Sequence, residues 1–182
     1  MRAVLRCLCL IWAALPGLAA AQSALPEALT TLMRDDPAWF VDVMTDVVAG
    51  YGGDDGLSAD EVDEYVALER AAARASALRQ FLAMDLDNDG ALTRPELAIS
   101  QRATSARQRG ILQRRFDAAD RDQDGRLSPT ELRADAEAAG LRAMTEPEAA
   151  ALRATLVFDA DGDARLSIAE VKAALATLDD AT

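Results

Sequence analysis

Residues 120–131, with the sequence DRDQDGRLSPTE, form the stretch that decides the fold. They place carboxylates at positions 1, 3, 5 and 12 of a twelve-residue segment, with a glycine at position 6 and a hydroxyl at position 9. Side chains at alternate positions of a tight loop can converge on one point, and Ca²⁺ takes about six to eight oxygen ligands at about 2.3–2.6 Å. Position 7 contributes its backbone carbonyl, and the closing glutamate contributes both carboxylate oxygens. The spacing therefore predicts a calcium-binding loop.

The same segment contains the start signal of a helix. Ser128 can accept a hydrogen bond from the amide three residues later, and Pro129 suits the first helical turn. Glu131 then completes an S/T-x-x-E capping box. We therefore expect one glutamate to close the loop and to cap the outgoing helix.

Two further segments repeat the pattern: DLDNDGALTRPE at residues 85–96 and DADGDARLSIAE at residues 159–170. Both have alternating aspartates, a leucine at position 8, a hydroxyl at position 9 and a closing glutamate. Three such copies resemble the EF-hand superfamily, whose unit is a helix, a calcium loop and a second helix. The predicted calcium ligands are Asp85, Asp87, Asp89, Ala91, Thr93, Glu96, Asp120, Asp122, Asp124, Arg126, Ser128, Glu131, Asp159, Asp161, Asp163, Arg165, Ser167 and Glu170, with the position-7 residues acting through their carbonyls.

Residues 50–61, GYGGDDGLSADE, resemble a damaged fourth loop. With Glu61 at position 12, Ser58 falls at position 9 and Leu57 at position 8, but positions 1 and 3 are both glycine. We interpret the segment as a silent hand that is kept for pairing. The alternative is a weak ion site formed by Asp54, Asp55, Ser58 and Glu61.

The resemblance implies an all-α fold with four helix-loop-helix units in two paired lobes and very short β-bridges between the loops. An isolated loop strand would leave its backbone groups unpaired, so the loops are expected to pair through their position-8 leucines. Chain order predicts that Leu57 pairs with Leu92, and that Leu127 pairs with Leu166.

Residues 1–21 have the pattern of a secretory signal peptide, with two arginines, an apolar core and an A-x-A cleavage site. The apolar core is shorter than the roughly 20 residues that span a membrane, so a retained anchor is the less favoured alternative. The predicted division of the chain is a signal peptide at 1–21, a lead-in helix at 22–36, an N-terminal pair of hands at 37–105 and a C-terminal pair at 106–182.

Composition excludes several classes of chemistry. The chain carries 31 acidic and 19 basic residues, a formal net charge of −12, and no histidine. Its two cysteines, Cys7 and Cys9, lie in the predicted signal peptide, so disulfides, thiol catalysis and the usual zinc sites are excluded from the mature chain. The negative charge makes nucleic acid and anionic membrane surfaces poor partners. Calcium is the predicted cofactor, and the sequence names no protein partner.

Apolar residues spaced three and four apart predict amphipathic helices before the loops. The helix over residues 37–48 has Trp39 in its apolar set. The Ala-rich segment 62–84 predicts either one continuous helix or two helices with a bend near the middle, with Leu82 in its buried stripe. Gly140 predicts the end of the helix that follows the 120–131 loop.

Arginines are concentrated around the linker between the 85–96 and 120–131 loops. We interpret them as the solvated face of a linker helix, and the alternative is a contact surface for an acidic partner or for the acidic loops themselves. The six arginines are Arg94, Arg102, Arg107, Arg109, Arg114 and Arg115.

The 159–170 loop is predicted to be the weakest of the three. It has Ala164 at position 6, and its glycine stands two residues earlier. Alanine in a left-handed conformation costs about 1 kcal/mol, which is about fivefold in affinity. Mg²⁺ is the competing ion, but a bidentate glutamate suits the larger and less regular coordination sphere of Ca²⁺.

These expectations favour a secreted or periplasmic calcium buffer or calcium-stabilised structural protein that catalyses no reaction. The alanine- and arginine-rich usage with a short signal peptide is typical of a bacterial protein. The alternative is a calcium-dependent sensor or adaptor that binds a protein partner through a Met-rich groove, although few methionines are present. An enzyme with a carboxylate pair is the third hypothesis, and it is disfavoured because the carboxylates are accounted for as ligands.

Overall fold

The computed structural model describes residues 27–179, which are mostly helical. The predicted signal peptide lies outside the described residues. Short helical turns, η1 (Val48–Gly52), η2 (Gly53–Asp55) and η3 (Thr155–Phe158), interrupt the longer elements. Those elements are α1 (Glu27–Asp35), α2 (Pro37–Val47), α3 (Ala59–Leu82), β1 (Leu92–Thr93), α4 (Arg94–Gln101), α5 (Ala106–Ala119), β2 (Arg126–Leu127), α6 (Pro129–Ala143), α7 (Glu146–Ala154) and α8 (Ile168–Asp179).

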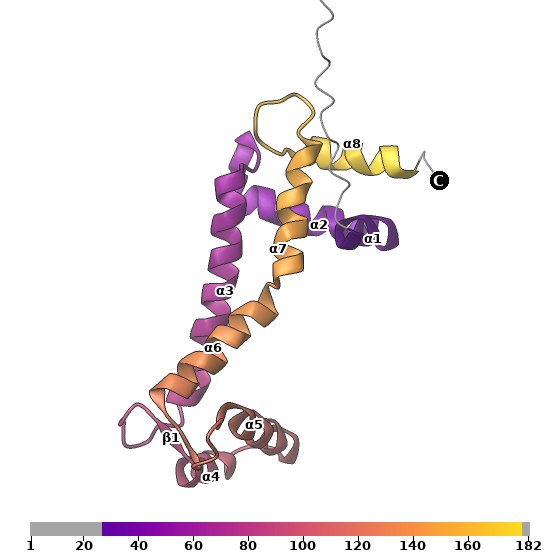
Figure 1. The fold of residues 1–182 in the computed structure, drawn as a ribbon. Helices are drawn as coiled ribbons and strands as arrows, with labels where there is room; N and C mark the ends of the chain where they lie inside the picture. Colours follow the sequence, from indigo (N-terminus) through magenta and orange to yellow (C-terminus); the bar gives the residue numbers. More distant parts are fainter. Residues whose placement is uncertain (1–26, 180–182) are drawn as a thin grey trace, which may run out of the picture.

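Helix α3 organises the molecule. It is a single continuous helix of 24 residues, which decides between the two alternatives that the sequence left open. At a rise of about 1.5 Å per residue it is about 36 Å long, with the 50–61 loop at its start and the 85–96 loop at its end. Figure 1 shows α4, α5 and β1 gathered at one end of α3, and α1, α2 and α8 at the other.

The loops pair differently from the prediction. Strands β1 and β2 are antiparallel, with Leu92 opposite Leu127. Leu57 forms an isolated bridge with Leu166, through N–H···O distances of 3.0 and 2.9 Å.

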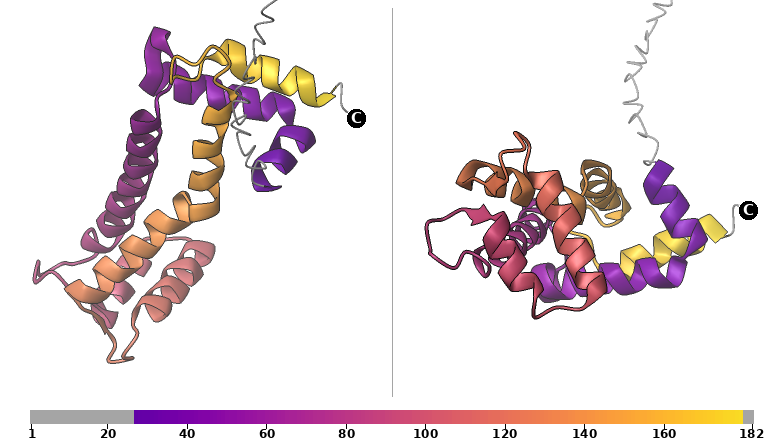
Figure 2. Two further views of the ribbon diagram at one scale, coloured as in Figure 1. Left: turned by 45° about the horizontal axis from the view of Figure 1, so that its top comes forward. Right: turned by 90° about the horizontal axis from the view of Figure 1, so that it is seen from below.

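The pairing expected from chain order is therefore wrong. The physical reason is α3, because a rigid helix of this length keeps the loops at its two ends apart. Helices α4 and α5 keep the chain near the C-terminal end of α3, so the 120–131 loop lies beside the 85–96 loop. The chain then returns through α6 and α7 to the start of α3, which brings the 159–170 loop beside the 50–61 loop (Figures 1 and 2). The proposed domain boundaries stay a prediction, because contacts between loops do not show which segments fold as units.

Two hydrophobic clusters accompany the two loop pairs. One contains Leu92 and Leu127 together with Phe81 and Phe116, all 2% exposed or less. The other contains Leu57 and Leu166 and is built from α1, α2, α7, α8 and the start of α3. Its buried members are Leu29, Met33, Phe40, Met44, Val47, Val48, Leu57, Val62, Ala151, Leu166, Val171 and Leu175.

Helices α3 and α6 lie side by side between the clusters, as Figure 1 shows. Gly140 lies within α6, which continues to Ala143, so its predicted role as the end of the helix is wrong. A Cβ atom at this position would stand 3.1 Å from the carbonyl oxygen of Arg70 and 3.2 Å from Cγ of Arg74. The glycine permits close approach of the two helices.

Two large residues are more exposed than the sequence predicted. Trp39 is 49% exposed, because it lies about 100° around α2 from the stripe formed by Phe40, Met44 and Val47. Leu82, the last residue of α3, is 50% exposed. Within residues 27–179, no helix combines the length and the apolar character needed to cross a bilayer.

Candidate metal centre

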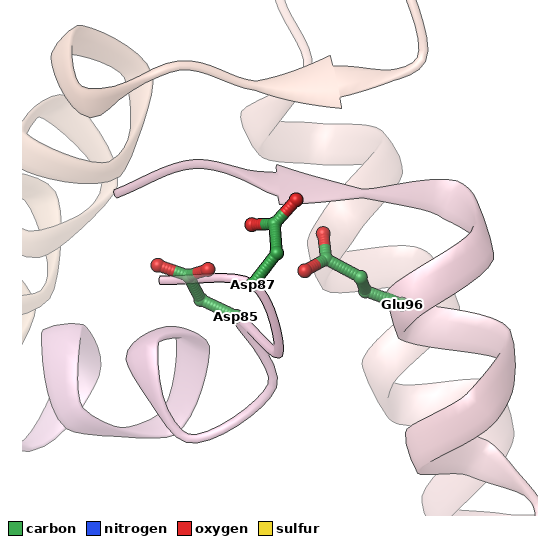
Figure 3. Close-up of side chains that lie close together, drawn as sticks. All are labelled: Asp85, Asp87 and Glu96. Carbon is green, nitrogen blue, oxygen red and sulfur yellow. The ribbon is translucent and has the colours of Figure 1, made fainter. Parts of the chain in front are cut away.

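Three groups of carboxylates lie at the three predicted loops. Each group joins the aspartates at positions 1 and 3 to the glutamate at position 12, and one oxygen from each residue lies within 4.8 Å of the others. Figure 3 shows the first group, in which the carboxylates of Asp87 and Glu96 point toward one another beside Asp85. The groups are Asp85, Asp87 and Glu96; Asp120, Asp122 and Glu131; and Asp159, Asp161 and Glu170.

The glutamate at position 12 connects the loop to its outgoing helix. Oε2 of Glu96 accepts hydrogen bonds from the backbone N–H and the hydroxyl of Thr93, at 2.8 and 2.7 Å. Its Oε1 accepts one from the N–H of Leu86, at position 2, at 2.8 Å. The other two loops repeat these contacts, through Ser128 and Arg121 to Glu131 and through Ser167 and Ala160 to Glu170.

These hydrogen bonds favour the ionised form of the closing glutamates. Bonds from the Thr93 side chain and backbone lower the pKa of Glu96 to about 2. Backbone bonds from Ser167 and Ala160 lower the pKa of Glu170 to about 2, and a backbone bond from Ser128 lowers that of Glu131. The three side chains are therefore charged acceptors at neutral pH.

The loop backbone turns through two left-handed residues, at positions 4 and 6. In the first loop these are Asn88 and Gly90, with φ of 58° and 82°. In the 159–170 loop Gly162 occupies position 4 and Ala164 occupies position 6, with φ of 77° and 66°. The strain at Ala164 that the sequence predicted is present, but the glycine relieves position 4, where the other loops have an asparagine or a glutamine. Sequence reasoning missed this compensation.

Backbone amides hold the aspartates of each loop in place. In the 120–131 loop, the N–H of Gly125 donates to Oδ2 of Asp120 at 3.2 Å, and the N–H of Asp124 donates to Asp122 at 3.2 Å. The N–H of Arg126 donates to Asp124 at 2.7 Å. The 85–96 and 159–170 loops show the same three bonds. The acceptor oxygens are thus oriented by the fold.

The surroundings of Asp120 indicate that the 120–131 site fits a cation. The residue is 3% exposed, and its Oδ1 atom is buried with no hydrogen-bond partner. A buried carboxylate oxygen without a donor is costly unless a cation satisfies it. Hard oxygen donors of this kind are the ligands that Ca²⁺ prefers, and a bound ion would supply the partner that Oδ1 of Asp120 lacks.

The predicted ligands at positions 5 and 9 have partners within their own loops. The position-5 aspartates, including Asp89, accept backbone N–H bonds and lie outside the groups of three. The hydroxyls of Thr93, Ser128 and Ser167 are engaged in the capping boxes. They fit the indirect role expected at position 9, where the ligand often acts through water.

Arginines connect the 85–96 and 120–131 loops, which form the first loop pair; the 50–61 and 159–170 loops form the second. Arg126 donates to Oδ2 of Asp89 at 2.7 Å, and Arg94 donates to Oδ2 of Asp120 at 3.3 Å while stacking 4.9 Å from the Phe116 ring centroid. Of the six linker arginines, Arg94 thus contacts an acidic loop, as the second interpretation expected. Arg115 instead bonds Asp135 on α6. The spacing of the loops did not reveal these contacts, because they depend on which loops pair.

The 50–61 loop has a different backbone. Helix α2 runs into the π-helical turn η1 and then into η2, so the first residues of the loop are helical. The part of the chain that the structure describes holds no acidic group of three at this loop. Glu61 and Ser58 nevertheless form the same capping box as in the other loops, at the start of α3.

Comparison with known proteins supports the two loops at the C-terminal end of α3. Residues 78–98 and 112–134 match the EF hand family, and these segments contain the 85–96 and 120–131 loops with parts of their flanking helices. No curated protein and no solved structure matches the chain. The chain therefore contains two segments of EF-hand type, whose family binds calcium, and its acidic groups could hold a metal ion.

Proposed function

We propose that the protein binds Ca²⁺ at the 85–96, 120–131 and 159–170 loops and acts as a calcium buffer or a calcium-stabilised structural protein. In this proposal the chain has four hands in two pairs, of which the hand at residues 50–61 binds no ion. The protein catalyses no reaction, because its clustered carboxylates serve as ligands and caps.

The observation that carries the proposal is the repetition of one geometry. In all three loops the closing glutamate completes an acidic group and caps the outgoing helix. An ion that binds the glutamate therefore stabilises the start of that helix. Calcium binding and folding are coupled through this residue.

The direct test is a calorimetric titration of the purified protein with CaCl₂. We expect three ions per chain, with the 159–170 site weaker than the other two. Titration with MgCl₂ is expected to show lower affinity, because Mg²⁺ requires a smaller octahedral sphere. Absence of calcium binding in a folded sample would refute the proposal.

The sensor alternative has one observation in its favour. Leu86 and Ile99, beside the first loop pair, are 56% and 47% exposed, and such residues could contribute to a partner surface. Against it, the buried methionines are divided between the two hydrophobic clusters, with Met33 and Met44 in one and Met84 in the other, so they do not line one groove. Fluorescence of an apolar dye with and without calcium separates the two functions. A buffer shows no calcium-dependent rise, and a sensor does.

We also propose that the protein is secreted or periplasmic, on the basis of the signal-like sequence at residues 1–21. Outside the cytoplasm, modest calcium affinity suffices for a storage or structural role. Fractionation of expressing cells, with N-terminal sequencing of the exported product, tests this. A product that starts at residue 22 is expected, and retention of the full chain in the cytoplasm would contradict it.

A further inference from the structure

Arg165 connects the 159–170 loop to the 50–61 loop. Its Nε atom donates to the backbone carbonyls of Asp55 and Gly56, at 2.9 and 3.0 Å. Its Nη2 atom lies 3.1 Å from both carboxylate oxygens of Glu61. One guanidinium is thus surrounded by four oxygens of the partner loop, two from carbonyls and two from a carboxylate.

These oxygens include the ligand positions that survive in the damaged loop. With Glu61 at position 12, the carbonyl of Gly56 stands at position 7, and both are calcium ligands in an intact hand. Positions 1 and 3, at Gly50 and Gly52, offer no side-chain oxygen. Arg165 therefore contacts the part of the coordination set that the sequence has kept.

The contacts of the closing glutamate show what the arginine replaces. In the other three loops, Oε1 of that glutamate accepts a hydrogen bond from the N–H at position 2, as Leu86 donates to Glu96. In the 50–61 loop, position 2 is Tyr51, which lies in the π-helical turn η1, and Oε1 of Glu61 accepts from Arg165 instead.

Arg165 is also held in its own loop. Its backbone N–H donates to Oδ1 of Asp163 at 2.8 Å. The neighbouring Leu166 exchanges two backbone hydrogen bonds with Leu57. The arginine is therefore positioned by the same pairing that it supports.

We propose that the guanidinium of Arg165 is a built-in cation for the 50–61 loop, which takes the place of a metal ion and keeps this loop paired whether or not calcium is present. The loop positions assigned to Gly56 and Glu61 rest on the proposed function, but the hydrogen bonds of Arg165 to the 50–61 loop are all made to protein oxygens. We therefore expect the contacts between Arg165 and the 50–61 loop to be independent of calcium, whereas the three acidic loops bind calcium.

A double-mutant cycle in EDTA tests the interaction without calcium. Urea unfolding is compared for the wild type, Arg165→Gln, Glu61→Gln and the double variant. Each single substitution is expected to raise the equilibrium constant for unfolding by roughly five- to tenfold, because a multidentate charged hydrogen bond is lost. The double variant is expected to raise this constant by less than the product of the two single effects, because the Arg165–Glu61 contact is lost only once, while the bonds from Arg165 to the two carbonyls are lost in both Arg165 variants. Effects that multiply fully in the double variant would overturn the proposal.

Arg126→Gln is the matched control. Arg126 stands at position 7 of its loop, as Arg165 does, and also reaches the partner loop, but it makes one exposed ion pair, with Asp89. Its loss is expected to change the unfolding constant less than about twofold. Arg165→Lys restores the charge without the forked donors, so its stability should lie between those of the wild type and Arg165→Gln. An Arg126→Gln loss as large as that of Arg165→Gln would show that the Arg165 contacts are ordinary surface pairs.

Two further measurements test the inference without comparing the stabilities of the variants. In NMR spectra of the wild type, the Nε–H proton of Arg165 should exchange slowly with solvent in EDTA and in excess CaCl₂. In calcium titrations, Glu61→Gln should bind as many ions as the wild type. Fast exchange, or the loss of one ion in Glu61→Gln, would overturn the inference. If the wild type binds no calcium, the proposed function fails while the cycle in EDTA still reports on Arg165.

Discussion

The two loop pairs reach a similar arrangement by different means. In the 85–96 and 120–131 pair, both loops have an acidic group of three and the leucines belong to a two-stranded sheet. In the 50–61 and 159–170 pair, one loop lacks such a group and the leucines form a single bridge. Arginines cross the first pair in both directions, whereas in the second Arg165 reaches into the loop that lacks the acidic group. Two loops can therefore pair when only one of them has an acidic group of three, and in the second pair the oxygens of the other loop contact Arg165.

The largest effect is expected on calcium affinity, when the closing glutamate of the 120–131 loop is replaced. Glu131→Gln removes the charged closing ligand from the 120–131 loop and should lower its calcium affinity roughly 100-fold, because affinity depends on ligand charge. Calorimetry should then count two strong events at most. Glu148→Gln is the matched control, because Glu148 caps α7 through the same box with Thr145 but belongs to no acidic group. A similar loss of affinity in both variants would show that the cap, and not the ligand, matters.

The next largest effect is expected on the free energy of unfolding, when the contact between the 50–61 and 159–170 loops is disrupted. Gly56 has φ of 85°, and an added Cβ would stand 3.1 Å from the carbonyl oxygen of Leu166. Gly56→Ala should therefore lower the free energy of unfolding by about 2 kcal/mol, from the left-handed backbone and the displaced partner strand together. Gly53→Ala meets nothing within 4 Å at φ of 58° and should cost about 1 kcal/mol. Urea unfolding in EDTA measures both, and equal losses would contradict the close contact.

A smaller effect on calcium affinity tests the predicted order of affinities among the three sites. Ala164→Gly relieves the left-handed strain at φ of 66° and should raise the calcium affinity of the 159–170 loop about fivefold. Gly90→Ala introduces the same strain in the 85–96 loop, where an added Cβ meets nothing within 4 Å, and should lower affinity by a similar factor. Calorimetry of the two variants checks the pair. Unchanged affinity in both would mean that position 6 does not control binding.

The smallest effect concerns pH and a cap that lies outside the loops. Hydrogen bonds from the Thr145 side chain and backbone lower the pKa of Glu148 below its ordinary value of 4.5. A carboxyl whose pKa is lowered by folding stabilises the fold above the unfolded pKa, and this stability is lost as pH falls through the folded pKa. Because the side chain is exposed, Glu148→Gln should cost only a few tenths of a kcal/mol at pH 7. Thermal unfolding in EDTA should show the difference shrinking as pH falls toward 3, and a constant difference would contradict it.

Local features of the fold could be predicted from the sequence. The capping boxes at Thr93, Ser128 and Thr145, and the convergence of positions 1, 3 and 12, follow from spacing alone, because each involves residues within about a dozen positions. The pairing of the loops could not be predicted in this way. It depends on α3 being one straight helix, and an Ala-rich sequence allows both a straight and a bent helix.

Long-range contacts account for most of what the sequence missed. The sequence predicts a helix end at Gly140 because glycine is common there, whereas its role comes from the close approach of α3. Arg165 was predicted to contribute only its carbonyl, because position 7 acts through the backbone, and its side-chain role depends on a loop more than 100 residues earlier. Both residues show that a position within a motif does not determine what its side chain meets across the fold.

The most direct test of the account is a crystal structure of the protein grown in excess CaCl₂. We predict one ion in each of the 85–96, 120–131 and 159–170 loops, held by the three carboxylates of each group, and the guanidinium of Arg165 against Glu61 in the 50–61 loop. Three loops without ions, or a calcium ion bound to Glu61 with Arg165 turned to solvent, would contradict the account.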